Sequence, residues 1–246
     1  MHAQGKRHMK NKFWYIKRVD IFSAMSDADL EQLSQVSSMC GFKRGEIIYF
    51  PEEPSEHVYL LKEGKVKISR VSEDGREIIL EIIGQGEIFG ELSLFGEEAR
   101  SAMAEAIADS TICNVRREEF ERFLRLHSEL AFRIMKLVGF RRTEIESRME
   151  ELAFLPVPAR IAGLLARFAK KYGVVEGGEV KIGIGLTHRE IAYLVGASRE
   201  TVTDILNRMK GEGIIRTSFR TITILDMDAL TYGSDSRREA RTGGRM

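Results

Sequence analysis

The chain has 246 residues, of which 43% are hydrophobic and 30% are charged, and its formal net charge is +1. This length fits one large domain or two modest ones, with enough apolar residues for buried cores. A net charge near zero does not indicate a globally basic nucleic-acid binder, although a local basic face remains open. The two cysteines, Cys40 and Cys113, lie in no CxxC or Cys/His cluster. A disulfide scaffold, a zinc site and a cysteine-ligated iron–sulfur cluster therefore have no support. An enzyme has little support either, because no nucleophile–base pair or metal-ligand spacing stands out in the sequence.

The sequence pattern predicts neither a membrane span nor a secretion signal. No apolar run approaches the ~20 residues of a membrane span, and no apolar core follows the basic residues 1–12. We therefore expect a cytoplasmic protein that does not enter a membrane. Residues 1–12 and 233–246 are polar and contain several basic residues, and we expect them to be disordered tails.

The first half of the chain changes from a helical to a β pattern. Ser26-Asp27-Ala28-Asp29 is typical of a helix start, and apolar residues follow it at helical spacing. After Phe42, short β-rich runs alternate with glycines and acidic turns, and Asp74-Gly75 is the clearest hairpin turn. Such a series predicts an antiparallel barrel or roll. The expected strands are Ile47–Phe50, His57–Leu61, Lys65–Val71, Ile78–Ile83, Met103–Ala106 and Thr111–Val115.

From Glu118 the apolar residues recur at three- and four-residue steps, which predicts one long amphipathic helix. A stripe of this length has little left in its own domain to cover it, so we expect the same helix of a second copy as its partner. The alternative is a helix that packs back on its own roll. The stripe consists of Leu130, Ile134, Leu137, Val138, Ile145, Met149 and Leu152.

Pro156 and Pro158 end that helix and mark a domain junction. Basic residues outnumber acidic ones after the junction, up to Leu230, whereas acidic residues dominate between Gly45 and Ala99. The later segment is therefore the better candidate for binding a large anion such as DNA. Its expected elements are a helix at Ala159–Tyr172, a glycine-rich turn at Gly173–Gly178, a strand at Val180–Ile184, two close helices, and a hairpin of Ile214–Arg216 with Thr221–Leu225.

The two close helices have the pattern of a helix-turn-helix. Thr187 caps the first helix, and Glu190 completes a capping box with it. Gly196 supplies the left-handed turn, and Ser198 caps the second helix. The alternative is a plain helical hairpin with an exposed arginine, but the caps, the turn glycine and the hairpin that follows together favour DNA binding.

The second helix of this pair opens with side chains suited to base edges in the major groove. Arg199 can donate two hydrogen bonds to a guanine, and Glu200 can accept one from a cytosine. Thr187, Ser198 and Thr203 are suited to phosphate contacts.

A second constellation lies at residues 88–102. Gly90 allows a close approach of the backbone to a ligand, and Arg100 with Ser101 offers a cation and a hydroxyl to a phosphate. Glu91 can accept a bond from a ribose hydroxyl. Together these groups suit a nucleotide with one negative charge, although Arg100 could instead pair with Glu97 or Glu98.

From about residue 13 to 229 the chain resembles the CRP/FNR transcription regulators. The resemblance implies an α+β fold with an N-terminal β-roll of the cyclic-nucleotide-binding type, a long dimerisation helix and a C-terminal winged helix-turn-helix. Three motifs resemble the phosphate-binding cassette, the interdomain hinge and the recognition helix of the cyclic-AMP-receptor branch. They are Phe89-Gly90-Glu91-Leu92-Ser93-Leu94-Phe95 with Arg100-Ser101-Ala102, Leu152-Ala153-Phe154-Leu155 with Arg160-Ile161-Ala162, and Val195-Gly196-Ala197-Ser198-Arg199-Glu200-Thr201-Val202.

The resemblance implies cyclic AMP or a related cyclic nucleotide as effector, with Arg141 of the long helix steadying Glu91. The implied effector-binding residues are Gly90, Glu91, Leu92, Arg100, Ser101 and Arg141. Family receptors place Thr and Ser against the adenine, where this chain has Ile145 and Glu146. A regulator that senses another ligand, or none, therefore stays open as an alternative.

The implied partners are double-stranded DNA, a second copy bound through the long helix 128–152, and RNA polymerase. Asp204 stands where the receptor branch carries a further arginine, so we expect a related but different DNA half-site. A cyclic-nucleotide-sensing subunit that binds protein instead of DNA is a third hypothesis. The implied DNA-binding residues are Thr187, His188, Ser198, Arg199, Glu200, Thr203 and Asp204. The implied domains are a roll at 13–127, a dimerisation helix and hinge at 128–155, and a DNA-binding domain at 156–232.

Overall fold

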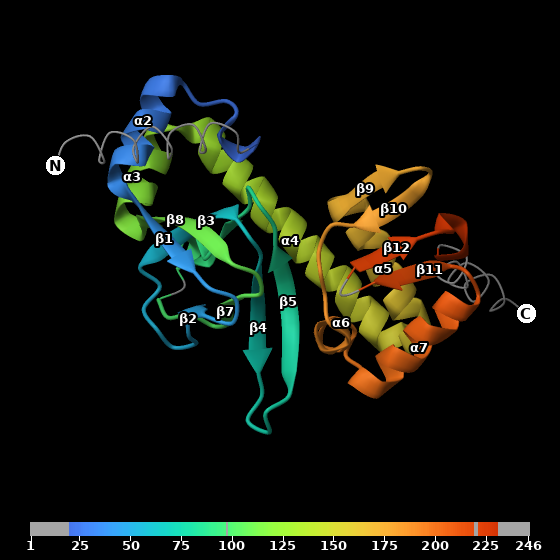
Figure 1. Ribbon diagram of the computed structural model, residues 1–246. Coiled ribbons are helices and arrows are strands. Elements are labelled where there is room, and N and C mark those ends of the chain that lie inside the picture. The colour runs from blue at the N-terminus through green and yellow to red at the C-terminus, as the bar shows by residue number, and fades with distance from the viewer. Residues whose placement is uncertain (1–19, 97, 219–220, 231–246) are drawn as a thin grey trace, which may run out of the picture. The chain divides into compact units, whose positions relative to one another are not determined.

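The computed structural model describes residues 20–96, 98–218 and 221–230 (Figure 1). The chain divides into two compact units, Met1–Thr143 and Glu144–Met246, and each is described by itself. The predicted tails at 1–12 and 233–246 lie outside the described residues. Among the described helices, none is both long and apolar enough to cross a bilayer.

The first unit is built on two four-stranded antiparallel sheets, as the sequence predicts. Buried side chains from both sheets form one apolar cluster, which includes Leu61, Val66, Ile83 and Phe89. This cluster is the interior of the β-roll. One sheet has the order β1(Ser37–Phe42), β8(Ser110–Arg116), β3(His57–Glu63), β6(Ile88–Phe89), and the other has the order β2(Ile47–Tyr49), β7(Met103–Ala106), β4(Val66–Val71), β5(Glu77–Ile83).

Helices cover the outer face of the first of these sheets (Figure 1). A second apolar cluster joins Val58 and Val115 of this sheet to Leu33 and Phe120 of the covering helices. Ser26 caps the first full helix, and its capping box with Asp29 confirms the predicted helix start. The covering elements are η1(Asp20–Phe22), α2(Asp27–Val36), α3(Arg117–Leu126) and the first part of α4(Ser128–Phe154).

Two strands, β1 and β6, were not expected from the sequence, and the helical pattern from Glu118 contains two helices. β1 follows α2 directly, so no turn residue separates the two elements, and the strand forms through six paired positions with β8. β6 has only two residues, too few for an alternation pattern. The expected helix from Glu118 is in fact α3 and α4, which are separated at His127.

The second unit has the element order of a winged helix-turn-helix. Its four strands form one antiparallel sheet in the order β11(Ile215–Ser218), β12(Thr221–Ile224), β10(Glu179–Ile182), β9(Gly173–Glu176). The expected turn at Gly173–Gly178 is wrong for its first four residues, which form β9 and pair with β10. The turn itself is made by Gly177 and Gly178, both at positive φ. The elements are α5(Val157–Tyr172), β9(Gly173–Glu176), β10(Glu179–Ile182), α6(His188–Val195), α7(Arg199–Gly211), β11(Ile215–Ser218) and β12(Thr221–Ile224).

Candidate functional site

The predicted ligand-binding segment forms a tight turn in the roll. Gly90 adopts φ 70° and precedes the short 3-10 helix η2(Glu91–Phe95). A Cβ at this position would lie 2.9 Å from Cδ2 of Tyr59 and 3.0 Å from Nη1 of Arg100. Gly90 is therefore required both by its left-handed backbone and by the close packing of its neighbours.

Arg100 lies inside the roll, with only 4% of its surface exposed. Its Nη1 donates to the carbonyl oxygen of Gly90 at 3.1 Å, and Nη2 donates to that of His57 at 2.5 Å. The Cζ atom lies 4.5 Å from the ring centroid of Tyr49 and 5.6 Å from that of Tyr59. These carbonyl and ring contacts orient the guanidinium, and an anion is the kind of ligand that its positive charge suits.

A buried ion-pair network connects the ligand-binding segment to the long helix. Nη1 of Arg141 lies 2.7 Å from Oε1 of Glu91, and its Nε lies 3.0 Å from Oε1 of Glu81. Burial lowers the pKa of Arg141, but the two carboxylates outweigh it and raise the pKa above its usual value. The expected contact between Arg141 and Glu91 is confirmed, and it joins α4 to the predicted effector site.

Two predicted ligand residues lie on the surface. Ser101 is exposed, and Leu92 is 45% exposed. Two further residues of this site were not expected from the sequence: Tyr49 and Tyr59, whose rings lie 5.6 Å apart beside Arg100. The position of Tyr59 could have been predicted from the alternation of residues along β3. Tyr59 and Leu61 are two positions apart, so both side chains point to the inner face of the roll.

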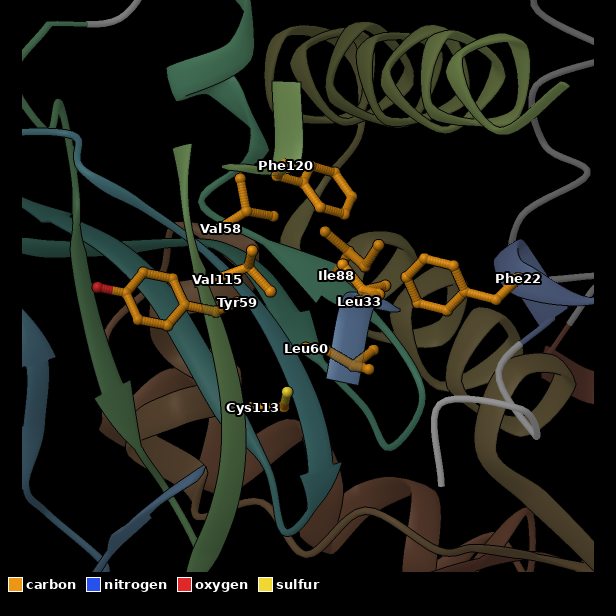
Figure 2. Close-up of a pocket in the computed structure, with 9 residues that line it drawn as sticks. All are labelled: Phe22, Leu33, Val58, Tyr59, Leu60, Ile88, Cys113, Val115 and Phe120. Carbon is orange, nitrogen blue, oxygen red and sulfur yellow. The ribbon is translucent and has the colours of Figure 1, made fainter. Parts of the chain in front are cut away.

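A small apolar cavity of about 20 Å³ lies at the outer face of the sheet formed by β1, β8, β3 and β6 (Figure 2). It is lined by side chains from β3, β6 and β8 and from the covering helices. The volume would admit one water, but the apolar lining offers it few hydrogen bonds. In Figure 2 the hydroxyl of Tyr59 points away from the other lining side chains, and this cavity is not the predicted effector site. Its lining consists of Phe22, Leu33, Val58, Tyr59, Leu60, Ile88, Cys113, Val115 and Phe120.

The helix-turn-helix has the predicted caps. Thr187 and Glu190 form a capping box at the start of α6. Gly196 ends α6 at φ 63°, and Ser198 accepts a hydrogen bond from the amide of Thr201 at the start of α7. Both caps and the turn between the helices therefore lie where the sequence predicts.

The predicted DNA-binding residues differ in what their side chains do. Arg199, Glu200 and Asp204 are exposed on the first turns of α7. The hydroxyls of Thr187 and Ser198 cap helices. His188 and Thr203 are half-buried and hydrogen-bonded to each other. Arg199, Glu200 and Asp204 can therefore reach a groove, whereas the side chains of the other four already hold the motif together.

Side chains of the neighbouring helices support the turn between α6 and α7, which the sequence analysis did not anticipate. Arg148 of α4 donates to the carbonyl oxygen of Leu194 at 2.9 Å, and Arg160 of α5 donates to that of Val195 at 2.7 Å. A Cβ at Gly196 would lie 2.9 Å from Cδ2 of Leu152. The carbonyls at a helix end have no partner within the helix, so two arginines stabilise this end of α6.

A roll with a buried arginine, followed in the chain by a winged helix-turn-helix, is the arrangement of a DNA-binding transcription regulator. Residues 40–127 match the family model of the cyclic nucleotide-binding domain, and residues 159–232 match that of the Crp-like helix-turn-helix domain. The chain belongs to the CRP/FNR family of transcription regulators, and it is not an enzyme.

Several characterised relatives extend over most of the chain. The CRP-like cAMP-activated global transcriptional regulator of Mycobacterium tuberculosis is 32% identical over 87% of this chain and 96% of its own length. The global nitrogen regulator of Synechococcus elongatus is 31% identical over 77% of this chain and 86% of its own length. The chain is therefore similar both to a protein named for cAMP and to one named for nitrogen control.

Solved structures show the same fold. A CRP/FNR-family transcriptional regulator from Thermus thermophilus superimposes with a TM-score of 0.63 at 30% identity, over 81% of this chain and all of that one. FixK2 from Bradyrhizobium japonicum gives a TM-score of 0.73 at 24% identity, over 80% of this chain and 96% of that one. The α+β architecture of the family is thereby confirmed.

Proposed function

We propose that this DNA-binding regulator acts as a cytoplasmic homodimer that binds a palindromic site and is controlled by a cyclic nucleotide in the β-roll. The proposal depends on one observation: the cationic side chain of Arg100 lies inside the roll among carbonyl oxygens and aromatic rings. A buried guanidinium of this kind is a suitable partner for a cyclic phosphate. The Mycobacterium tuberculosis relative, which is named as cAMP-activated, supports the same effector.

The proposed homodimer uses α4, which exposes a series of large apolar side chains. Exposed residues of this size favour burial against a second copy of the helix. The series consists of Phe132, Met135, Phe140, Ile145, Met149, Leu152 and Phe154. Effector binding then favours one arrangement of the helix pair, so that two copies of α7 lie about one DNA turn, ~34 Å, apart.

At the DNA, Arg199 and Glu200 read base edges, and the carboxylate of Asp204 accepts from a cytosine or excludes other bases. RNA polymerase is a further proposed partner, and the segment Gly173–Gly178 is proposed as its contact only by analogy with the family. The proposed domain boundaries are those expected from the sequence, with the roll at 13–127 and the DNA-binding domain at 156–232.

One observation favours a second candidate, a regulator of the same family that answers another ligand or none. Ile145 and Glu146 stand where cyclic-AMP receptors place Thr and Ser against the adenine. The Ile145 side chain offers no hydrogen bond to a base, and the Glu146 carboxylate can accept one but donates none.

Calorimetric titration with cyclic AMP and cyclic GMP tests the effector. We expect wild type to bind one of them and Arg100→Leu to lose binding while remaining folded. Arg76→Leu is the matched control, because Arg76 lies in the hairpin turn between β4 and β5, where it pairs with the exposed Asp74. Normal binding by Arg100→Leu would contradict the proposed site, and no binding of either nucleotide to wild type would favour the second candidate.

A further inference from the structure

A hydrogen-bonded pair connects the two helices of the helix-turn-helix. Nδ1 of His188, at the start of α6, lies 2.8 Å from Oγ1 of Thr203 on α7. The same hydroxyl donates to the carbonyl oxygen of Arg199 at 2.9 Å. A threonine hydroxyl has one proton, so its oxygen accepts from the ring, which places the ring proton on Nδ1.

This arrangement argues against direct phosphate contacts by the two residues. The proton of Thr203 is used within α7, so the hydroxyl has none left to donate to a phosphate oxygen. The Nδ1 proton of His188 is directed at Thr203, so this donor is not available to a phosphate. Both side chains are half-buried between the helices, as expected of a packing contact.

The hydrogen bond between His188 and Thr203, here called the bridge, lies at the turn of α7 that carries the proposed base readers Arg199 and Glu200. Arg199 both accepts the bond from Thr203 through its carbonyl and projects its own side chain into solvent. Glu200 follows it on the same exposed turn. A shift of α7 relative to α6 would therefore displace both base readers together, and hydrogen bonds to base edges tolerate little displacement.

We propose that His188 and Thr203 are positioning residues that set the direction in which Arg199 and Glu200 meet the bases, and thereby determine base specificity. The inference rests on the proposed role of those two residues as base readers. It replaces the phosphate contact expected for Thr203, and the DNA contact expected for His188, with an internal bridge.

Matched amide variants test which ring nitrogen acts. The amide nitrogen of Asn can occupy the place of Nδ1, whereas that of Gln occupies the place of Nε2. We expect His188→Asn to keep the base preference of wild type in a selection from random duplexes and His188→Gln to lose it. Likewise, Thr203→Ser retains the hydroxyl and the preference, and Thr203→Val loses both.

The expected loss is about tenfold in discrimination at the base positions that Arg199→Ala also relaxes. The salt dependence of non-specific duplex binding stays unchanged, because no phosphate contact is removed. The reverse result, with Gln functional and Asn not, would overturn the proposal. So would a uniform loss of affinity with a salt slope smaller by about one, which indicates a phosphate contact.

Two further measurements distinguish a failure of the base-reader assignment from a failure of the bridge. If Arg199→Ala leaves base preference unchanged, the base-reader assignment fails and the positioning role fails with it. Nitrogen-15 NMR of the wild-type protein tests the bridge without any variant, and thus without a risk of misfolding. A His188 ring protonated on Nδ1 is expected, and a ring protonated only on Nε2 would reverse the direction of this hydrogen bond and overturn the argument against a phosphate contact.

Discussion

Arg148 of α4 donates a hydrogen bond to the carbonyl oxygen of Leu194, near the end of the first helix of the helix-turn-helix, at 2.9 Å. Arg160 stabilises the next carbonyl in the same way, and its Nε donates to the carbonyl oxygen of Leu155 just after α4. Two cations thus connect the end of the long helix to the turn before the recognition helix. Any rearrangement of α4 near residue 148 must move or break these bonds.

We predict that Arg148→Met destabilises the second unit by about 1–3 kcal/mol. The substitution removes the hydrogen bond that the charged Arg148 donates, so the carbonyl oxygen of Leu194 at the end of α6 loses that partner. Thermal unfolding followed by circular dichroism measures the effect. Arg208→Met, at an exposed position of α7, is the matched control and should change stability little. Equal melting temperatures for the two variants would contradict the capping role.

Gly196→Ala should cost about 1–3 kcal/mol of stability, because its φ of 63° is unfavourable for alanine and its Cβ would meet Leu152. Adding Leu152→Ala removes the steric contribution to this loss of stability and leaves the contribution of the unfavourable backbone angle. A double-mutant cycle in denaturant unfolding separates the two contributions. Gly211→Ala is the control, since nothing lies within 4 Å of a Cβ there and no positive φ applies. A Gly196→Ala protein as stable as that control would show that neither constraint operates.

Arg141→Met should destabilise the first unit by about 3 kcal/mol or more. It leaves the carboxylates of Glu81 and Glu91 partly or fully buried without their cation, and a broken buried pair costs more than the pair contributes. Glu91→Gln in the same chain should restore part of the loss. Urea unfolding of the single and double variants measures this, and an additive loss in the double variant would contradict direct pairing.

His57 gives stability a specific dependence on pH. Burial lowers the pKa of His57 below its ordinary value of 6.5 in the folded chain. The unfolded chain therefore binds the proton more readily, so this contribution to stability is present above pH 6.5 and is lost as the pH falls through the folded pKa. NMR titration should give a pKa below 6.5, and His57→Gln should flatten stability across that range. A pKa at or above the ordinary value would contradict the burial effect.

Much of this architecture is predictable because its signals are local. The caps at Ser26, Thr187 and Ser198 and the turn at Gly196 each depend on residues within four positions of one another. The Asp74-Gly75 hairpin is equally local, and β4 and β5 pair across it.

The contacts that the sequence did not reveal join residues distant along the chain. Tyr49 lies 51 positions from the guanidinium beside it, Arg148 lies 46 positions from Leu194, and β1 depends on β8 rather than on its own pattern. Only the folded chain brings such groups together. The pairing of Arg141 with Glu91 was foreseeable from the family resemblance, and the contact of Arg141 with Glu81 was not.

Selection of bound duplexes from a random pool, with and without cyclic AMP, tests effector-controlled DNA recognition most directly. The proposed function predicts two related half-sites in inverted orientation, about one helical turn apart, with stronger enrichment when the nucleotide is present. The preference should disappear in Arg199→Ala. A stable monomer that shows no preference among duplexes, with or without cyclic AMP, would contradict it.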